Sequence, residues 1–341
     1  YDEKKSTVNL VFKYIEKMKI TDAAPFLKTI LESENVDYFD AAISALGSVG
    51  GVEEAVFLSE FIDKDELSLG QRQSLVKALG KLQVVETWDK LVEFAEDEDE
   101  NSYIRMYSAE AIGNMKKDES VDILIKLFES TDPNLRQYVL KGLSNFTTEK
   151  VEDLVVSALK DDHYKVRTEA IEIVKDQKIT KAVPYIIYRA KNDSEKSVKS
   201  AAYKALGILN TNECIDLLVE IVENEKASET LRAEVSSVIL ENDINRGIDV
   251  VIEVAKKSLT DDKKKNLRYA LGKEFAKYKK ASFSEICGLY LESKDVATQG
   301  TGLDIFKAHK YPSLKAKVEE IEKSEKESSI KKKAKLILES L

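Results

Sequence analysis

The fold is decided by residues 102–115, SYIRMYSAEAIGNM. This stretch places an aliphatic residue directly before Arg105 and ends on a small–aliphatic–glycine triplet, Ala111, Ile112 and Gly113. Its apolar residues recur at spacings of three and four, which is the period of an amphipathic helix. The stretch therefore predicts a helix that buries one face.

The same pattern recurs through nearly the whole chain of 341 residues. With the last residue of the triplet as a marker, successive copies follow at intervals of 31 to 36 residues. A repeat of this length is typical of a unit that cannot bury its apolar faces alone and stacks on its neighbours. The markers are Glu16, Gly47, Gly80, Gly113, Ser144, Lys175, Gly207, Leu240, Ala276, Lys307 and Leu338.

A second column of residues lies eight positions before the markers and consists mainly of arginine. Six of the eight arginines of the chain stand in it, and Lys199 fills the one gap in the run. Chance would put each arginine there about one time in thirty, the inverse of the repeat length. The period is therefore real. The arginines of the column are Arg72, Arg105, Arg136, Arg167, Arg232 and Arg268.

Each repeat contains the pattern of two helices. Nine residues after the marker, most repeats have a proline or an acidic residue, such as Pro25, Asp89 and Pro184. These residues suit the first turn of a helix for steric and dipole reasons. In the sixth repeat, for example, we expect helices over residues 180–191 and 195–209.

The proline or aspartate start, the acidic turn, the aliphatic–arginine pair and the Ala-Leu-Gly ending resemble HEAT repeats. Among these, they resemble the short bacterial HEAT-like, phycobilisome-lyase type. The resemblance covers about residues 22–340. It implies an all-α fold, an α-solenoid of about ten two-helix repeats with the second helices on the concave side. We expect a single domain over residues 1–341, with a partial repeat helix in 1–19 and the hairpins in 20–341.

The resemblance also implies a structural role for the arginine column. Acidic residues of the turns would pair with the arginines and form a ladder that ties each turn to its neighbour. The alternative is an arginine track that binds phosphates. Because acids accompany the arginines so regularly, the structural interpretation is favoured. The acids are Asp65, Asp99, Asp132, Asp161, Asp193 and Asp261.

A third column lies three residues before the markers and should face the concave groove. Over five consecutive repeats its charge alternates in sign. Neighbouring repeats lie roughly 10 Å apart, so we expect salt bridges between them, each worth little. The groove floor would then be nearly neutral. These five residues are Lys77, Glu110, Lys141, Glu172 and Lys204.

Met106, Tyr107 and Tyr138 occupy the other expected groove-facing positions of the third and fourth repeats. Methionine and aromatic side chains on an exposed helix face suit a partner peptide or helix. The alternative is that the rings only pack over neighbouring helices. Together with the charged column, these three residues are the candidate partner-binding residues on the concave side.

Composition bounds the partners of the chain. Its net charge of −9, from 62 acidic and 53 basic residues, argues against a general nucleic-acid binder, as does a neutral groove floor. The longest uncharged run, residues 41–52, is too short to span a membrane. The sequence begins at Tyr1 without Met, so a removed signal peptide would decide the compartment, which the sequence leaves open.

We find no catalytic constellation in the sequence. His163 and His309, the only histidines, stand more than four repeats apart, and neither precedes Glu as in HEAT-like enzymes that bind two irons. The sole tryptophan, Trp88, is expected on a first helix, unlike the groove tryptophan of HEAT-like DNA glycosylases. Cys214 and Cys287 are expected to be buried free thiols. We therefore expect no catalytic, cofactor or metal site.

The function favoured by the sequence is a non-catalytic scaffold, expected to be a monomer, that binds a protein or peptide partner on a curved helical surface. The concave face and the ridge are both open as the binding face. The alternative is an accessory or lyase-like factor that acts on a partner's bound prosthetic group.

Overall fold

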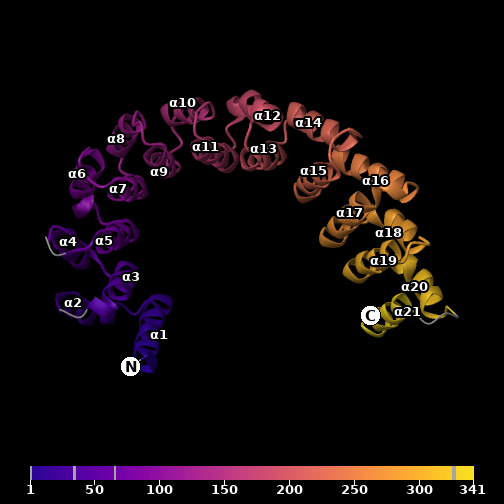
Figure 1. Ribbon diagram of the computed structural model, residues 1–341, viewed down its shortest axis with the longest axis horizontal. Helices are drawn as coiled ribbons and strands as arrows, with labels where there is room; N and C mark the ends of the chain where they lie inside the picture. Colours follow the sequence, from indigo (N-terminus) through magenta and orange to yellow (C-terminus); the bar gives the residue numbers. More distant parts are fainter. Residues whose placement is uncertain (1, 34–35, 65–66, 325–327) are drawn as a thin grey trace. The chain divides into compact units, whose positions relative to one another are not determined.

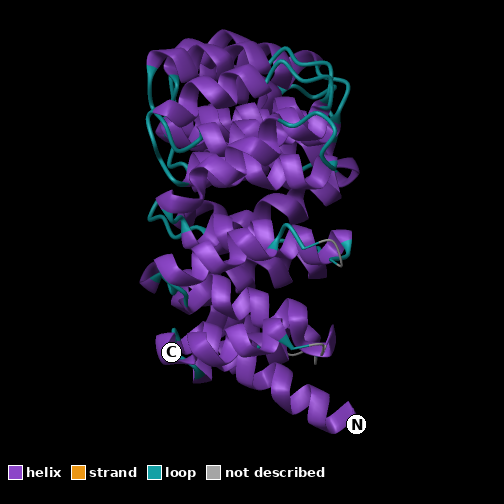
Figure 2. Ribbon diagram, turned by 90° about the vertical axis from the view of Figure 1, so that its left-hand side faces the viewer, coloured by secondary structure: helices purple, strands orange, loops and turns teal. Residues whose placement is uncertain are grey.

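The structure is a computed structural model that describes residues 2–33, 36–64, 67–324 and 328–341. Over these ranges it contains helices and connecting loops and no strand (Figure 2). In the same ranges the helices pair into ten hairpins, which one further helix precedes. This confirms the prediction of an all-α solenoid built from about ten two-helix repeats.

Contacts between Cα atoms divide the chain into two compact units, Tyr1–Gln177 and Lys178–Leu341. The first unit holds the leading helix and repeats one to five, and the second unit holds repeats six to ten. The single domain over residues 1–341 stays a prediction.

In the first unit, the first helices of the hairpins form one row and the second helices form another, on the concave side of the unit (Figure 1). Successive second helices contact one another directly. The leading helix is α1 (Asp2–Met18). The first helices are α2 (Ala24–Glu32), α4 (Val52–Phe61), α6 (Trp88–Glu96), α8 (Glu119–Leu127) and α10 (Glu149–Ala158). The second helices are α3 (Phe39–Val49), α5 (Leu69–Leu82), α7 (Ser102–Asn114), α9 (Pro133–Leu143) and α11 (Tyr164–Gln177).

The second unit repeats the same two-row arrangement. Its first helices are α12 (Val183–Asn192), α14 (Asn212–Glu223), α16 (Asn245–Leu259), α18 (Phe283–Leu291) and α20 (Lys315–Glu322). Its second helices are α13 (Lys196–Leu209), α15 (Glu229–Glu241), α17 (Lys265–Lys277), α19 (Val296–His309) and α21 (Ser329–Glu339). The two helices expected in the sixth repeat are thus α12 and α13. The former begins later than expected because residues 180–182 form a 3₁₀ turn before it.

The helices begin where local side chains satisfy their free N–H groups. The Ser68 hydroxyl accepts from the Gln71 N–H at 3.3 Å, and the Gln71 side chain accepts from the Ser68 N–H at 2.8 Å, which makes a capping box for α5. Asp132 accepts from the Asn134 N–H at 2.9 Å, and Pro133 begins α9. Helix starts were therefore encoded locally.

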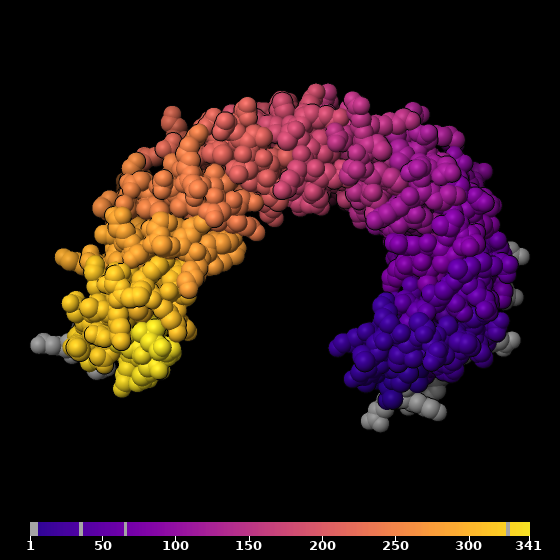
Figure 3. All heavy atoms as spheres, turned by 180° about the vertical axis from the view of Figure 1, so that it is seen from behind, coloured from indigo at the N-terminus to yellow at the C-terminus, as the bar shows by residue number. Residues whose placement is uncertain are grey.

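The small–aliphatic–glycine triplet brings neighbouring second helices close together. Ile112 is fully buried, whereas Gly113 faces the backbone of Gly142 on α9. A Cβ atom added to Gly113 would lie 2.3 Å from the Gly142 Cα. Only a residue without a side chain fits there. In Figure 3 the repeats of the first unit, coloured indigo to magenta, are in continuous contact.

A column of left-handed residues ends many of the second helices. Among the residues described, seven non-glycine residues have a positive φ, between 51° and 55°, and all of them lie three positions after a marker. A left-handed residue ends a helix by satisfying its last carbonyls. This column supports the register at Leu240 and Lys307, where the triplet has no glycine. Its members are Lys19, Gln83, Lys116, Lys178, Asn210, Asp243 and Lys310.

Candidate partner-binding surface

Two tyrosines form an edge-to-face pair on the concave side of the first unit. The ring centroids of Tyr107 on α7 and Tyr138 on α9 are 5.4 Å apart, and the ring planes meet at 79°. The Lys77 Nζ lies 4.2 Å from the Tyr107 ring centroid, and the Lys141 Nζ lies 4.2 Å from that of Tyr138. Such aromatic and cation–π geometries are attractive. We name these four residues the tyrosine patch.

The repeat period places the two rings together. Tyr107 and Tyr138 each stand six residues before a marker, so they occupy equivalent positions on neighbouring second helices. The close approach of α7 and α9 at Gly113 and Gly142 then brings the rings into contact. Both side chains are half-buried, so each keeps part of its ring open to the solvent.

Glu169, on α11, takes the same position one repeat later. Burial raises the pKa of the Glu169 carboxyl, although Gln137 donates a hydrogen bond to it at 3.3 Å. Burial also raises the pKa of Tyr138 to about 12, helped by the neighbouring Tyr107 and by the negative charge of Glu110. Tyr138 therefore remains a neutral phenol, able to donate and accept hydrogen bonds, at physiological pH.

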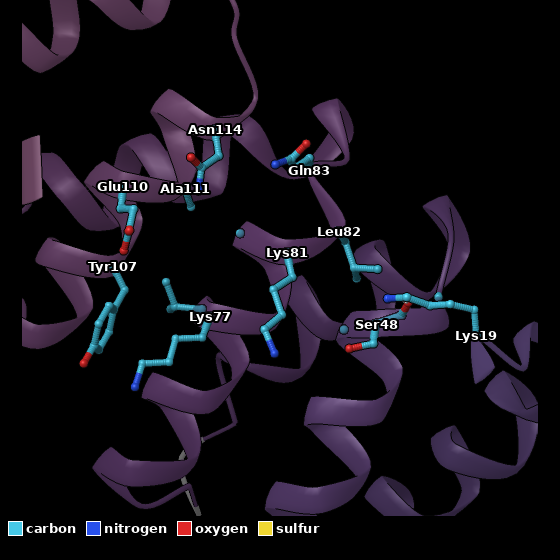
Figure 4. A pocket seen from close by; sticks show the side chains of 14 residues that line it. Lys19, Ser48, Lys77, Lys81, Leu82, Gln83, Tyr107, Glu110, Ala111 and Asn114 are labelled. Atoms are coloured by element: carbon cyan, nitrogen blue, oxygen red, sulfur yellow. Dashed lines mark hydrogen bonds between the residues drawn. The ribbon is translucent and has the colours of Figure 1, made fainter. Parts of the chain in front are cut away.

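A hollow of about 740 Å³ adjoins the tyrosine patch on the concave side (Figure 4). It lies over the C-terminal ends of α3, α5 and α7. Lys19, the residue that follows α1, also lines it. Tyr107 and Lys77 belong to both the patch and the wall of the hollow. The patch and the hollow thus form one continuous surface.

Met106 does not face this surface. The prediction that it faces the groove is wrong, because its side chain is only 6% exposed and belongs to the core. Met106 and Tyr107 are consecutive, so they lie about 100° apart around the helix. Tyr103 was missed: it is 50% exposed and precedes Tyr107 by four residues, which puts both on one face of α7. The spacing of four and three residues between Tyr103, Tyr107 and Glu110 in the sequence was the signal that these side chains share one helix face.

The charged column makes different contacts from those predicted. Within the part of the chain that the structure describes, no ion pair links Lys77, Glu110, Lys141 and Glu172 across repeats. Lys77 and Lys141 lie over the tyrosine rings instead. Glu172 forms an ion pair with Lys175 on its own helix. A lysine ammonium group is attracted more strongly to an adjacent aromatic ring than to a carboxylate from which solvent separates it.

Lys204 belongs to the second unit, where it is exposed on α13. It borders a separate hollow of about 490 Å³ together with Lys273 and three glutamates. The candidate residues are therefore divided between two surfaces, and only those of the first unit lie beside the tyrosine pair.

The arginine column contacts the ends of the first helices. Its members Arg105, Arg232 and Arg268 each donate from Nε to a main-chain carbonyl that has no partner within its helix. The acceptors are Ala95 O at 3.2 Å, Val222 O at 2.8 Å and Ser258 O at 2.9 Å, respectively. Arg167 donates from Nη1 to Asp161 O and Asp162 O, both at 2.9 Å. Each of these four guanidinium groups thus contacts main-chain oxygens of its own repeat.

Two members of the column also reach a carboxylate of the next repeat. Arg136 makes a two-point contact with Asp161, and Arg72 makes one with Glu100, at 3.1 and 2.6 Å. For the third repeat the acid expected in this ladder was Asp99, and Glu100 takes its place. Among the other expected acids, Asp65 lies outside the described residues. These two contacts follow the predicted ladder, whereas Arg105, Arg232 and Arg268 contact main-chain carbonyls instead of the carboxylates of the expected acids. The role of the column stays a prediction.

The tryptophan and the two cysteines all lie on first helices. Trp88, on the first helix α6, donates from Nε1 to the Ser120 hydroxyl at 3.1 Å. Cys214 and Cys287 are buried free thiols. Over the described ranges, no three His, Cys, Asp or Glu side chains are placed to hold a metal ion. Over the same ranges, no helix has the length and apolarity needed to cross a membrane.

Solved structures share this fold at low sequence identity. Kap121p bound to Nup53p is 13% identical over 96% of this chain and 40% of its own, with a TM-score of 0.56. Kap95p is 12% identical over 94% of this chain and 50% of its own, with a TM-score of 0.55. In that structure its binding induces the switch loops of RanGDP to adopt the GTP-bound conformation. A chain of the complex of CpcE and CpcF of phycocyanin lyase from Nostoc sp. PCC7120 is 15% identical over 74% of this chain and 94% of its own, with a TM-score of 0.40. The likenesses to Kap121p and Kap95p show the fold alone.

No curated protein matches the chain in sequence. The family model described as Spirochaete HEAT repeat protein matches residues 1–337. This confirms the resemblance to bacterial HEAT-like repeats that the sequence showed. The chain therefore belongs to the Spirochaete HEAT repeat protein family.

Proposed function

We propose that this chain is a non-catalytic scaffold and that its tyrosine patch binds a segment of a protein partner. The observation that carries this proposal is the Tyr107–Tyr138 pair. Two half-buried rings are held edge to face, with a lysine over each, on a concave surface beside an open hollow.

The side chains of the patch contact one another in the chain without a partner. Each ring is held by the other ring and by a lysine ammonium group, so binding costs little further side-chain entropy. Tyrosine combines a large apolar ring with a hydroxyl group, which is why it is enriched at protein interfaces. The charged neighbours would form the polar rim around these rings.

The fold is compatible with such a role. Kap121p, a solenoid of similar fold, was solved bound to Nup53p. A stack of second helices offers a long surface to which an extended segment can bind. The accessory or lyase-like alternative has no comparable support, since the likeness to the phycocyanin lyase subunits has a TM-score of 0.40.

A displayed library of random peptides, selected on the purified chain, tests the proposal. The affinity of the selected peptides is then measured by titration against the wild type and against a Tyr107→Ala/Tyr138→Ala variant. We expect the variant to bind them about tenfold more weakly or worse, because an aromatic anchor contributes more than 1 kcal/mol at an interface.

Tyr188→Ala is the matched control. Tyr188 is 55% exposed on α12, a first helix of the second unit, so its loss should leave the affinity unchanged. Circular dichroism checks that both variants fold. Peptides that bind the Tyr107→Ala/Tyr138→Ala variant as tightly as the wild type would overturn the proposal.

A further inference from the structure

The hollow beside the tyrosine patch carries a local excess of positive charge. Three of its lining residues are lysines, Lys19, Lys77 and Lys81, whereas Glu110 is the one carboxylate that lines it. Its formal charge of about +2 contrasts with the net charge of −9 of the whole chain. Figure 4 shows Lys77 and Lys81 extending from α5 between Tyr107 on one side and Ser48 on the other.

These ammonium groups keep free hydrogen-bond donors. Lys81 is exposed, and the described residues offer it no ion pair or hydrogen bond. Lys77 turns toward the Tyr107 ring at 4.2 Å, and Lys19 donates once, to Ser48 O at 3.1 Å. A lysine has three donors, so each of the three can still bind an anionic group.

Uncharged donors and acceptors lie between the lysines. Gln83 and Asn114 line the hollow at the ends of α5 and α7. The Asn114 Oδ1 accepts a hydrogen bond from Asn145 at 3.1 Å, which leaves the amide N–H groups of Asn114 for another partner. Amide side chains of this kind suit the backbone of an extended peptide.

We propose that the hollow binds an extended acidic segment of the protein partner, with carboxylates against Lys77 and Lys81 and the Tyr107 ring along its side. The inference rests on the proposed function, since it specifies the chemistry of the segment that the patch and the hollow would share. The two Lys side chains stand one helical turn apart on α5, and alternate residues of an extended segment are spaced by roughly 7 Å.

A peptide is favoured over a nucleic acid. Glu110 stands in the wall of the hollow, where it would repel the evenly spaced phosphates of a strand but can be avoided by a peptide with neutral residues between its carboxylates. Three lysines also give too small a basic surface for phosphate-driven binding in a chain of negative net charge.

The hollow of the second unit provides an internal comparison. Its lining residues include Lys204 and Lys273, but also Glu234, Glu241 and Glu274, so its formal charge is about −1. We therefore assign the acidic segment to the hollow of the first unit and not to the hollow of the second unit.

The probe is a fluorescein-labelled peptide of eight residues that alternates Glu and Ser, and fluorescence anisotropy measures its binding to the full chain. A peptide with Gln in place of Glu is the matched ligand. We expect the Glu peptide to bind and the Gln peptide to bind at least about tenfold more weakly. Equal binding of the two peptides would overturn the inference.

Charge reversal locates the site. Lys81→Glu should weaken binding of the Glu peptide about tenfold, since an attraction is replaced by a repulsion, whereas Lys81→Arg should preserve it. Lys226→Glu is the matched control, because Lys226 is an exposed turn lysine of the second unit and the change in net charge is the same. Equal losses for Lys81→Glu and Lys226→Glu would overturn the assignment to the hollow.

A labelled oligothymidylate of eight nucleotides separates the two classes of macromolecule. If it binds more tightly than the Glu peptide and loses affinity in Lys81→Glu, the hollow binds nucleic acid and the inference is wrong. Tyr138 does not line the hollow, so Tyr138→Ala separates the two proposals. Glu-peptide binding that needs Lys81 and not Tyr138 would support the hollow alone, whereas library peptides that need Tyr138 and not Lys81 would support the patch alone.

Discussion

Arg136 and Asp161 form a two-point ion pair that joins the fourth repeat to the fifth. The Arg136 Nε lies 2.8 Å from Asp161 Oδ2, and the Nη2 lies 2.8 Å from Oδ1. Their side chains are only 16% and 9% exposed. Burial by itself would raise the pKa of the Asp161 carboxyl, but the guanidinium and the His163 N–H outweigh it and hold that pKa below its usual range.

Replacing Arg136 by Ala should lower the free energy of unfolding by about 1.5–3 kcal/mol, the range for hydrogen bonds to charged groups that are largely removed from water. The loss also leaves Ser130 O without its donor at 2.8 Å. Urea unfolding followed by circular dichroism measures the change.

Arg246→Ala is the control for this prediction, because the Arg246–Asp216 pair is 57% and 61% exposed and should contribute less than about 1 kcal/mol. Affinity for the selected peptides should survive in Arg136→Ala. A variant that keeps full stability but loses peptide binding would show that the arginine column is a recognition track.

Gly113→Ala should destabilise the first unit by about 1–3 kcal/mol, the usual cost of overpacking a tight contact. Its new Cβ would lie 2.3 Å from the Gly142 Cα, which is backbone and cannot move aside cheaply. Gly70→Ala on α5 is the matched control, since its nearest neighbour, the Ser68 hydroxyl, is 4.0 Å away. That variant should be about 0.4–1 kcal/mol more stable than the wild type, and a similar loss in both would refute the close-packing account.

Lys116→Gly should stabilise the chain by up to about 1 kcal/mol. Lys116 has a φ of 54° after α7, a conformation that costs a side-chain-bearing residue about 1–2 kcal/mol, and glycine recovers this at a smaller entropic cost. Lys273→Gly, at an exposed position inside α17, should instead cost about 1 kcal/mol. Denaturant unfolding of both variants checks the opposite signs.

Asp295 should give the second unit a stability that depends on pH. Its carboxylate accepts from the Thr298 hydroxyl at 2.6 Å and the Tyr269 hydroxyl at 2.7 Å, and these bonds lower its pKa to about 2. In the unfolded chain the Asp295 carboxyl has a pKa of about 3.9, so on acidification it is protonated at a higher pH in the unfolded chain than in the folded one. The stabilisation is therefore complete above about pH 4 and is lost as the pH falls toward 2.

Urea unfolding of the wild type and of Asp295→Asn between pH 6 and pH 3 measures this dependence. The difference in unfolding free energy between the two proteins should be largest at pH 6 and should shrink below pH 4. A difference that stays constant over this range would contradict the assignment.

Cys214 and Cys287 should be inert in the folded chain. Both are buried, and burial raises the pKa of the Cys287 thiol to about 12, so the reactive thiolate is scarce at pH 8. A thiol reagent should label neither cysteine before unfolding and both after unfolding without reductant. A bridge between them found by mass spectrometry would contradict the register, because they stand on different first helices, α14 and α18.

The sequence by itself determined the repeat and its helices. Apolar spacing, capping residues such as Ser68 and the triplet at Gly113 are local properties, and each acts within a few residues of the chain. Their recurrence then required stacking, because a single hairpin cannot bury both of its helices. The α-solenoid of about ten repeats could therefore be predicted before any contact between repeats was known.

Only the tertiary structure decided what the side chains between the repeats contact. Lys77 could have met a glutamate or a ring, and the approach of α5 to α7 placed it over Tyr107. In the same way, Met106 is buried while Tyr103 is exposed, because neighbouring helices cover one side of α7. Such choices depend on distances across helices that are far apart in sequence, and the period of a repeat does not contain those distances.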